Sequence, residues 1–148
     1  MISRKTKYAL KALVTLAAEY KTRQPVLISE LAERDRTPKK FLEQILLELK
    51  NKGFLASKKG KGGGYLLAKS PEKISIGSVV RLFEGSVALL PCVSQTAYER
   101  CAECIDENAC GIRSVMKEVR DETARILDGT SLREVLERSY PPEGMYHI

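Results

Sequence analysis

The spacing of apolar residues predicts a mainly helical chain with one small β-hairpin. A first helix is expected near the start of the chain, where four apolar residues fall on one helical face: Leu10, Leu13, Val14 and Ala17. A short second helix follows at about residues 28–34, and residues 35–37 form a tight turn before the next apolar period begins. Two helices joined by so short a turn are typical of a helix-turn-helix, whose second helix enters a DNA groove.

The third predicted helix has the features of a recognition helix. Thr37 is a suitable N-cap residue, and Pro38 suits the first helical position, where a missing N–H costs nothing. Gly53 is suited to end the helix. One face is apolar and the opposite face is polar at its start: Leu42, Ile45, Leu46 and Leu49 on the first, Lys39, Lys40, Glu43 and Gln44 on the second. Readout of base edges in the major groove needs such polar side chains.

A glycine-rich hairpin is expected directly after this helix. Residues 54–56 and 65–67 read as two short strands, and the segment 57–64 between them holds three lysines and four glycines. Glycine permits a tight tip, and lysine favours phosphate or a minor groove. Such a tip alone is typical of a solvated loop, but after a helix with a polar leading face it predicts a DNA-binding wing. The predicted DNA contacts are Thr37, Pro38, Lys39, Lys40, Phe41, Glu43, Gln44, Lys58, Lys59, Gly60, Lys61 and Gly62.

Charge separates the two halves of the chain. The net charge is +6 and the isoelectric point is about 9.2. Residues 1–70 hold 16 Lys and Arg against 6 Asp and Glu, whereas residues 71–148 hold 9 against 13. This balance predicts a polyanion-binding first part and a separate second part. The first twenty residues have a charged start and an apolar middle, but Lys11 interrupts the run, so a core helix and a cytoplasmic protein are expected.

The second half predicts a core helix, an irregular segment and a long helix. The core helix spans about residues 74–83 and ends at Gly85, while residues 88–109 show no sustained period, which usually marks a functional loop. From Gly111 an apolar stripe has little left to pack on within one chain: Ile112, Val115, Met116, Val119, Ile126 and Leu127. It predicts a homodimer and a roughly palindromic operator. The expected division is a winged helix-turn-helix DNA-binding domain at 1–85, a cysteine-rich loop at 86–110, a dimerisation helix with a short closing helix at 111–138, and a flexible tail at 139–148.

Four cysteines follow one another along the irregular segment and at its end: Cys92, Cys101, Cys104 and Cys110. A cytoplasmic location disfavours a disulfide framework, and soft thiolates suit an iron–sulfur cluster or zinc. The one histidine, His147, lies far away in the tail, which excludes a mixed cysteine–histidine site within the loop. An all-cysteine zinc site usually has two close pairs, and here only Cys101 and Cys104 form one. The spacing leaves an iron–sulfur cluster, zinc, thiol redox sensing and no cofactor open.

The segments FLEQILLELKNKGFL and KGKGGGYLL, together with KYALKALVTLA and LFEGSV, resemble the Rrf2 family of bacterial winged-helix regulators over nearly the whole chain. The resemblance is to the IscR type, an iron–sulfur cluster regulator, with nitric-oxide-sensing and cysteine-metabolism repressors as relatives. It implies a winged helix-turn-helix fold, double-stranded DNA as a partner, and a 2Fe–2S or 4Fe–4S cluster on the loop. Cys104 and Cys110 match the last ligand pair of the IscR type, and Cys92 matches the first ligand.

The chain departs from the IscR pattern at the fourth ligand. Arg113 stands at the histidine position, and arginine cannot ligate a metal. The nitric-oxide-sensing relatives take an acidic ligand from the partner's first helix, but residues 7–9 offer no carboxylate. Cys101 is an extra cysteine, and we expect it to supply the missing ligand of an all-cysteine site. In IscR-type proteins the glutamate of FLEQ, here Glu43, tunes which operator the cluster-free form accepts.

These patterns predict a transcriptional regulator and not an enzyme. The lack of a histidine outside the tail disfavours Cys–His and Ser–His catalysis, GKGGGY lacks the triplet of a phosphate-binding loop, and Cys101–Cys104 lacks a thioredoxin-like context. Cluster binding is expected to order the loop and set the angle between two recognition helices, so that oxidation, nitric oxide or iron loss changes operator affinity. The alternatives are a cofactor-free repressor that responds to a metabolite or protein partner, and a regulator with a structural zinc.

Overall fold

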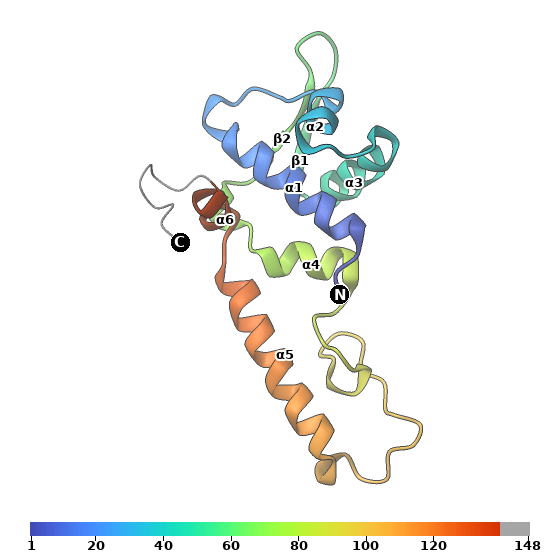
Figure 1. Ribbon diagram of the computed structural model, residues 1–148. Coiled ribbons are helices and arrows are strands. Elements are labelled where there is room, and N and C mark those ends of the chain that lie inside the picture. The colour runs from blue at the N-terminus through green and yellow to red at the C-terminus, as the bar shows by residue number, and fades with distance from the viewer. Residues whose placement is uncertain (140–148) are drawn as a thin grey trace.

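The computed structural model describes residues 1–139, and the predicted mainly helical fold with one hairpin is confirmed. The elements in this part of the chain are α1 (Arg4–Ala18), α2 (Ile28–Asp35), α3 (Lys39–Asn51), β1 (Leu55–Lys58), β2 (Gly64–Leu67), α4 (Ile76–Glu84), α5 (Gly111–Gly129) and α6 (Leu132–Ser139). Figure 1 shows a compact group formed by α1 to α4, α6 and the hairpin, from which α5 and the loop 86–110 project together.

Helix α1 lies at the centre of the compact group. It packs against α2, α3, α4, α6 and β2, and its buried side includes Ala9, Ala12 and Leu13, each 0% exposed. The two alanines let neighbouring helices approach closely. The Glu84 carboxylate at the end of α4 accepts hydrogen bonds from the Ser3 amide, at 2.6 Å, and from the Thr6 hydroxyl. The bond from Thr6 is the main reason why the pKa of Glu84 lies below its usual value.

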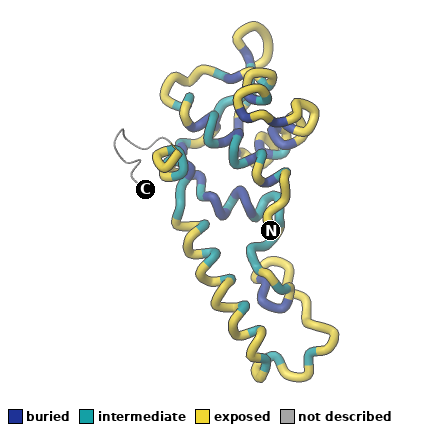
Figure 2. Tube along the Cα trace, in the orientation of Figure 1, coloured by how far each residue is buried: buried dark blue, intermediate teal, exposed yellow. Residues whose placement is uncertain are grey.

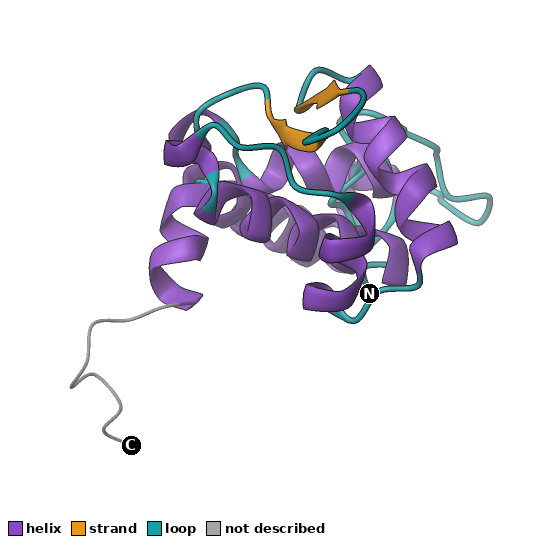
Figure 3. Ribbon diagram, turned by 90° about the horizontal axis from the view of Figure 1, so that it is seen from above, coloured by secondary structure: helices purple, strands orange, loops and turns teal. Residues whose placement is uncertain are grey.

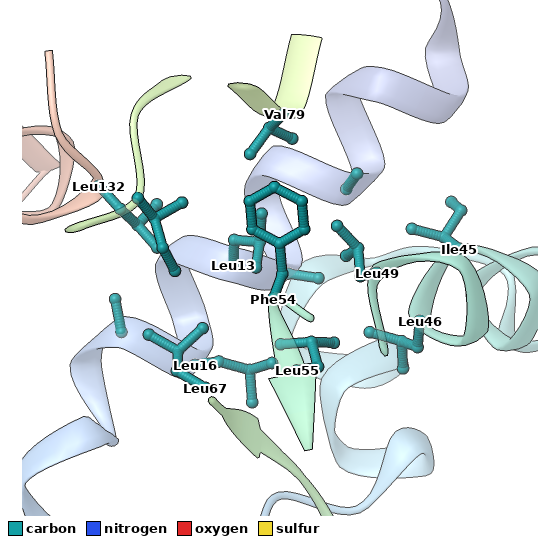
Figure 4. Packing of buried hydrophobic residues seen from close by; sticks show 14 of the residues in the cluster. Leu13, Leu16, Ile45, Leu46, Leu49, Phe54, Leu55, Leu67, Val79 and Leu132 are labelled. Atoms are coloured by element: carbon teal, nitrogen blue, oxygen red, sulfur yellow. The ribbon is translucent and has the colours of Figure 1, made fainter. Parts of the chain in front are cut away.

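Helix α3 buries the predicted apolar stripe. Its four members are each 0% exposed: Leu42, Ile45, Leu46 and Leu49. Figure 4 shows three of them meeting side chains of α1, the hairpin, α4 and α6 in one cluster. The predicted stop is also confirmed, because Gly53 has a φ of 82° directly after the C-cap residue Lys52.

The start of α3 differs from the prediction. Pro38 is itself the N-cap residue, α3 begins at Lys39, and no side chain of residues 1–139 caps it. Thr37 is buried instead, and its hydroxyl donates to the Asp35 carbonyl at 3.4 Å. The reason is that Arg36 ends α2 in the left-handed conformation, with a φ of 51°, which turns the chain and carries Thr37 inward.

The hairpin is fixed by a third piece of extended chain, which bridges to β2 near the tip end of the strands. β1 and β2 are antiparallel with Leu55 opposite Leu67 and Lys58 opposite Gly64, and they lie along one side of the helices (Figure 3). Val26 exchanges two backbone hydrogen bonds with Tyr65, at 2.8 and 2.9 Å. Gly64 is required beside this bridge, because a Cβ there would lie 2.3 Å from the Val26 carbonyl oxygen. The wing is therefore held to the segment that leads into α2.

Helix α6 returns to the compact group. Leu132 is 0% exposed within the core, its amide donates to the Ile74 carbonyl at 2.8 Å, and the Ile76 amide donates to Thr130 at 3.0 Å. The expected division groups this closing helix with the dimerisation helix at 111–138. In the structure, α6 packs on α1. Most of the predicted tail, residues 140–148, lies outside the described residues.

Helix α5 is attached by one side only. Arg81 of α4 forms an ion pair with Asp128, and Arg120 donates to the Val93 carbonyl of the loop at 2.8 Å. The structure describes every residue of α5, and none of them is buried. Figure 2 shows the contrast between this exposed helix and the buried core, drawn in dark blue above it. Four apolar side chains of the predicted stripe are exposed: Ile112 (66%), Val115 (55%), Val119 (36%) and Ile126 (53%). No helix within residues 1–139 is long and apolar enough to cross a membrane.

Candidate nucleic-acid interface and cysteine loop

The polar leading face of α3 is open to solvent. Most of the predicted contacts in this region are exposed: Pro38, Lys39, Lys40, Phe41, Glu43 and Gln44. Glu43 and Gln44 follow Lys40 by three and four positions, so that all three residues lie on one side of the helix. The leucine stripe on the opposite side holds this face outward. The arrangement exposes a donor, a carboxylate and an amide, which are groups capable of reading base edges.

Two of the predicted contacts also serve the fold. Thr37 is only 4% exposed, so its side chain does not belong to the open surface. Phe41 is 36% exposed, and its ring meets Tyr8 of α1 edge to face with 5.7 Å between the centroids. The sequence prediction missed Leu47, which is 52% exposed one turn beyond Glu43 on the same face. The available signal was that Leu47 does not belong to the period of the buried leucines.

The wing places its cations at an exposed tip. Lys58, Lys59, Gly60, Lys61 and Gly62 are all exposed. A backbone bond from the Gly63 amide to the Gly60 carbonyl, at 3.0 Å, closes the turn. Lys39 and Lys40 of α3 and the three wing lysines form no ion pair within residues 1–139. Because β1 packs against α3, the two cationic surfaces belong to one unit that can face a polyanion.

The four cysteines line one cavity beside the start of α5. Its volume is about 470 Å³, and Arg113 forms part of the same wall. Cys92 is buried on a 3-10 turn, Pro91–Val93, that packs against α5. Cys110 is the N-cap residue of α5, and its sulfur accepts from the Arg113 amide at 3.4 Å. Cys101 and Cys104 lie between these points, in the irregular stretch of the loop.

The cavity is not a closed site for a single metal ion. Within residues 1–139 no three Cys, His, Asp or Glu side chains converge on one point where an ion would bind. The Cys101 thiol donates to the Glu103 carboxylate at 2.8 Å, and this bond is the main reason why the pKa of Cys101 is raised. The chemistry of the donor set, four soft sulfurs around one space, suits a metal cluster.

Arg113, which stands at the position of the ligand histidine in the IscR pattern, has a structural role. Its guanidinium donates to the Cys92 carbonyl at 3.4 Å and lies 4.0 Å from the Glu107 carboxylate. Arg113 thus ties the first turn of α5 to the turn that holds Cys92. An arginine has no lone pair to offer a metal, so it contributes positive charge to the wall of the cavity.

The helix pair, the hairpin and the cysteine-bearing loop together define a winged helix-turn-helix DNA-binding protein with an appended helix. The chain belongs to the Rrf2 family, whose description is iron-dependent transcriptional regulator and whose family model matches residues 2–138.

Individual relatives agree with this assignment. A protein of Rhodobacter capsulatus named as an rrf2-like HTH-type transcriptional regulator is 46% identical over 143 residues, 95% of each chain. The structure of CymR, the global cysteine regulator of B. subtilis, gives a TM-score of 0.78 at 25% identity, over 93% of this chain and 97% of that one. The structure of T. potens IscR gives 0.75 at 25% identity, over 99% and 96%. These likenesses confirm the fold and the regulator class, and the two scores are too similar to choose between an IscR-like and a CymR-like protein.

Proposed function

We propose that this Rrf2 regulator senses iron–sulfur status, redox change or nitric oxide through an iron–sulfur cluster held by the cysteine loop, and that it binds operator DNA as a homodimer. The observation that carries the proposal is the common cavity of about 470 Å³ lined by Cys92, Cys101, Cys104 and Cys110. When bound, the cluster supplies redox-active iron that reacts with oxidants and nitric oxide. Cys101 provides the ligand for which Arg113 is unsuited.

The width of the donor set favours a cluster over zinc. A tetrahedral zinc has zinc–sulfur distances of about 2.3 Å, so its four sulfurs lie within roughly 4 Å of one another. The cysteines do not converge in this way. A cluster distributes its thiolate ligands over several iron atoms, and a set spread around a cavity suits it better.

The loop is built to transmit a change at the cavity to α5. Cys92 and Cys110 lie on segments already fixed against α5, whereas Cys101 and Cys104 lie on the irregular stretch between them. Ligation of all four holds that stretch against the start of α5. In a dimer formed through α5, the position of the loop then biases the angle between the two recognition helices.

A second copy of the chain is the proposed partner of α5. Ile112, Val115, Val119 and Ile126 form an exposed apolar stripe along the helix, whereas the apolar stripe of α3 is fully buried. A two-fold dimer covers the same stripe on both copies and presents two α3 helices and two wings to DNA. A roughly palindromic operator follows from that symmetry.

The test of the sensor is a visible absorption spectrum, with iron and sulfide assays, of protein purified without oxygen. Brown protein that loses its colour in Cys92→Ala and Cys110→Ala supports the cluster, and Cys101→Ala tests the fourth ligand. Ser114→Ala, at an exposed position in the first turn of α5, is the matched control and is expected to keep the colour. Colourless protein with stoichiometric zinc would make the loop structural.

A cofactor-free repressor is the second candidate function. It is favoured by the lack of three converging ligands within residues 1–139 and by the likeness to CymR, whose structure is described as that of a cysteine regulator. Metal-free protein that is colourless after anaerobic purification and still binds DNA would support it. In that case the four cysteines are at most redox-active thiols, and the signal is a metabolite or a protein partner.

A further inference from the structure

The turn between α2 and α3 contains a strained arginine. Arg23 and Arg36 are the non-glycine residues of the described chain with positive φ, at 56° and 51°. This left-handed conformation is unfavourable for a side chain with a Cβ, and glycine or asparagine is the usual choice. Such strain persists where surrounding structure imposes it, and it is found often at functional sites.

The residues on both sides of Arg36 fix its direction. Asp35 is 7% exposed, and it accepts hydrogen bonds from Thr15 at 2.7 Å and from the Lys11 ammonium. Thr37 is 4% exposed, and its amide donates to the Ala32 carbonyl at 3.0 Å. With both neighbours held inward, the exposed side chain of Arg36 is directed to the outside.

The two left-handed arginines differ in what their guanidinium groups contact. The group of Arg23 lies over the Tyr20 ring, 5.0 Å from its centroid, which gives that residue a role in the fold. Within residues 1–139 the guanidinium of Arg36 forms no hydrogen bond, ion pair or contact with an aromatic face. The fold therefore uses the backbone of Arg36 but not its charge.

Arg36 stands beside the open face of α3. Lys39 and Lys40 follow it, both exposed, and no acidic residue occupies the first turn of the helix. A planar guanidinium held outward at this place matches the bidentate geometry of a phosphate. We infer that Arg36 contacts a backbone phosphate of bound DNA and thereby fixes the register of α3 in the major groove. The inference rests on the DNA-binding function of the family and adds a residue that the sequence pattern did not indicate.

The test compares stability with DNA binding in Arg36→Gly. Glycine relieves the strained backbone, so the melting temperature is expected to stay unchanged or to rise by about 2 °C. Loss of the phosphate contact is expected to weaken binding about tenfold and equally for different sequences, and to reduce the slope of log affinity against log salt by about 0.9 for each Arg36 on DNA. The probe is a fluorescent duplex selected by the wild-type protein from a randomised library.

Two further variants make the result specific. Arg36→Lys keeps the charge and is expected to retain most of the affinity. Arg23→Gly removes the other left-handed arginine, in the loop that Figure 1 shows well away from α3, and is expected to leave the salt dependence unchanged. Arg36→Gly that binds with wild-type affinity and salt slope overturns the inference, as does an equal loss in Arg23→Gly. Failure of the wild-type protein to select any duplex would instead refute DNA binding itself.

Discussion

The compact winged-helix part (α1 to α4, the hairpin and α6) differs in its packing from the projecting arm, which consists of the loop 86–110 and α5. In the first, α3 contributes four side chains that are 0% exposed, and the helix packs against α1, α2 and β1. In the second, none of the residues of α5 is buried, and its apolar stripe faces outward. The charges differ as well, because the basic residues are concentrated in the first half of the sequence and the acidic residues in the second.

This difference shows which part of the molecule is complete within one chain. The compact part buries the apolar stripe of its recognition helix within its own chain and leaves mostly polar and charged groups exposed on the face offered to DNA. The arm leaves its apolar stripe exposed and gathers its four cysteines around one cavity, so that its final structure depends on what binds there. Under the proposed function those partners are a second copy and an iron–sulfur cluster, and the arm is the part through which a signal acts.

Removal of a core side chain is expected to have the largest effect. Leu49→Ala leaves a cavity at a site that is 0% exposed and should lower the free energy of unfolding by about 2–5 kcal/mol. Leu47→Ala is the matched control, because it is the same residue type on the same helix but is 52% exposed, and its cost should stay within about 0.5 kcal/mol. Urea denaturation measures both. Equal costs would contradict the view that the compact part is stabilised by its own core.

Lysines introduced into the apolar stripe of α5 are expected to dissociate the proposed dimer without unfolding its subunits. The double change Val115→Lys and Val119→Lys should raise the dimer dissociation constant at least about 100-fold, which corresponds to roughly 3 kcal/mol. Sedimentation gives the oligomeric state, and circular dichroism reports whether the helices remain. Lys117→Ala, on the far side of the same helix, should leave the oligomeric state unchanged. A double variant that sediments like the wild type would exclude this stripe as the interface.

Discrimination between DNA sequences is expected to depend on the Glu43 carboxylate of α3. Glu43→Ala removes a group that accepts from cytosine and repels phosphate, so discrimination should fall by about tenfold while overall affinity is kept or raised. Relative affinities across a randomised operator library measure the change. Glu33→Ala, an exposed acid of α2, serves as the control. Unchanged preference in Glu43→Ala would refute its role in readout.

The ion pair between α4 and α5 should give a small, pH-dependent effect. The hydrogen bond from Arg81 is the main cause that lowers the pKa of Asp128. A lowered pKa contributes stability that is complete above the ordinary carboxyl range and is lost as the pH falls through the lowered value. Both side chains are partly exposed, so Asp128→Asn should cost less than about 1 kcal/mol at neutral pH and nothing in strong acid. Unfolding followed from neutral to acidic pH tests this, with Glu118→Gln as the control.

Local patterns in the sequence predicted the elements well. The leucine period of α3, the stop at Gly53 and the glycine-rich hairpin are set by residues close together in the chain, and the structure contains all three. The predicted N-cap of α3, Thr37, was wrong, because it was chosen only for its residue type. The left-handed turn at Arg36 carries Thr37 into the interior and makes Pro38 the boundary of the helix.

The candidate site likewise combines features that local sequence predicted with features that depend on tertiary contacts. The exposed face of α3 followed from helical periodicity, and the four cysteines were visible as residue types suited to a cluster. Their arrangement around one cavity depends on where the loop returns against α5, and no local spacing determines that. The sequence offered no sign that Arg113 bonds the Cys92 carbonyl, because this contact joins residues far apart in the chain.

The sequence by itself determined the helices, the wing, the charge asymmetry and the presence of four thiols, because each depends on residue type and short-range spacing. The tertiary structure decided that α1 is the centre of the core, that α6 closes on it instead of on α5, and that the stripe of α5 is left open. Those outcomes are set by competition among all apolar faces for the same buried space. Leu132 enters the core because α6 packs on α1 and its amide bonds the Ile74 carbonyl, whereas Val115 is covered by no surface within residues 1–139.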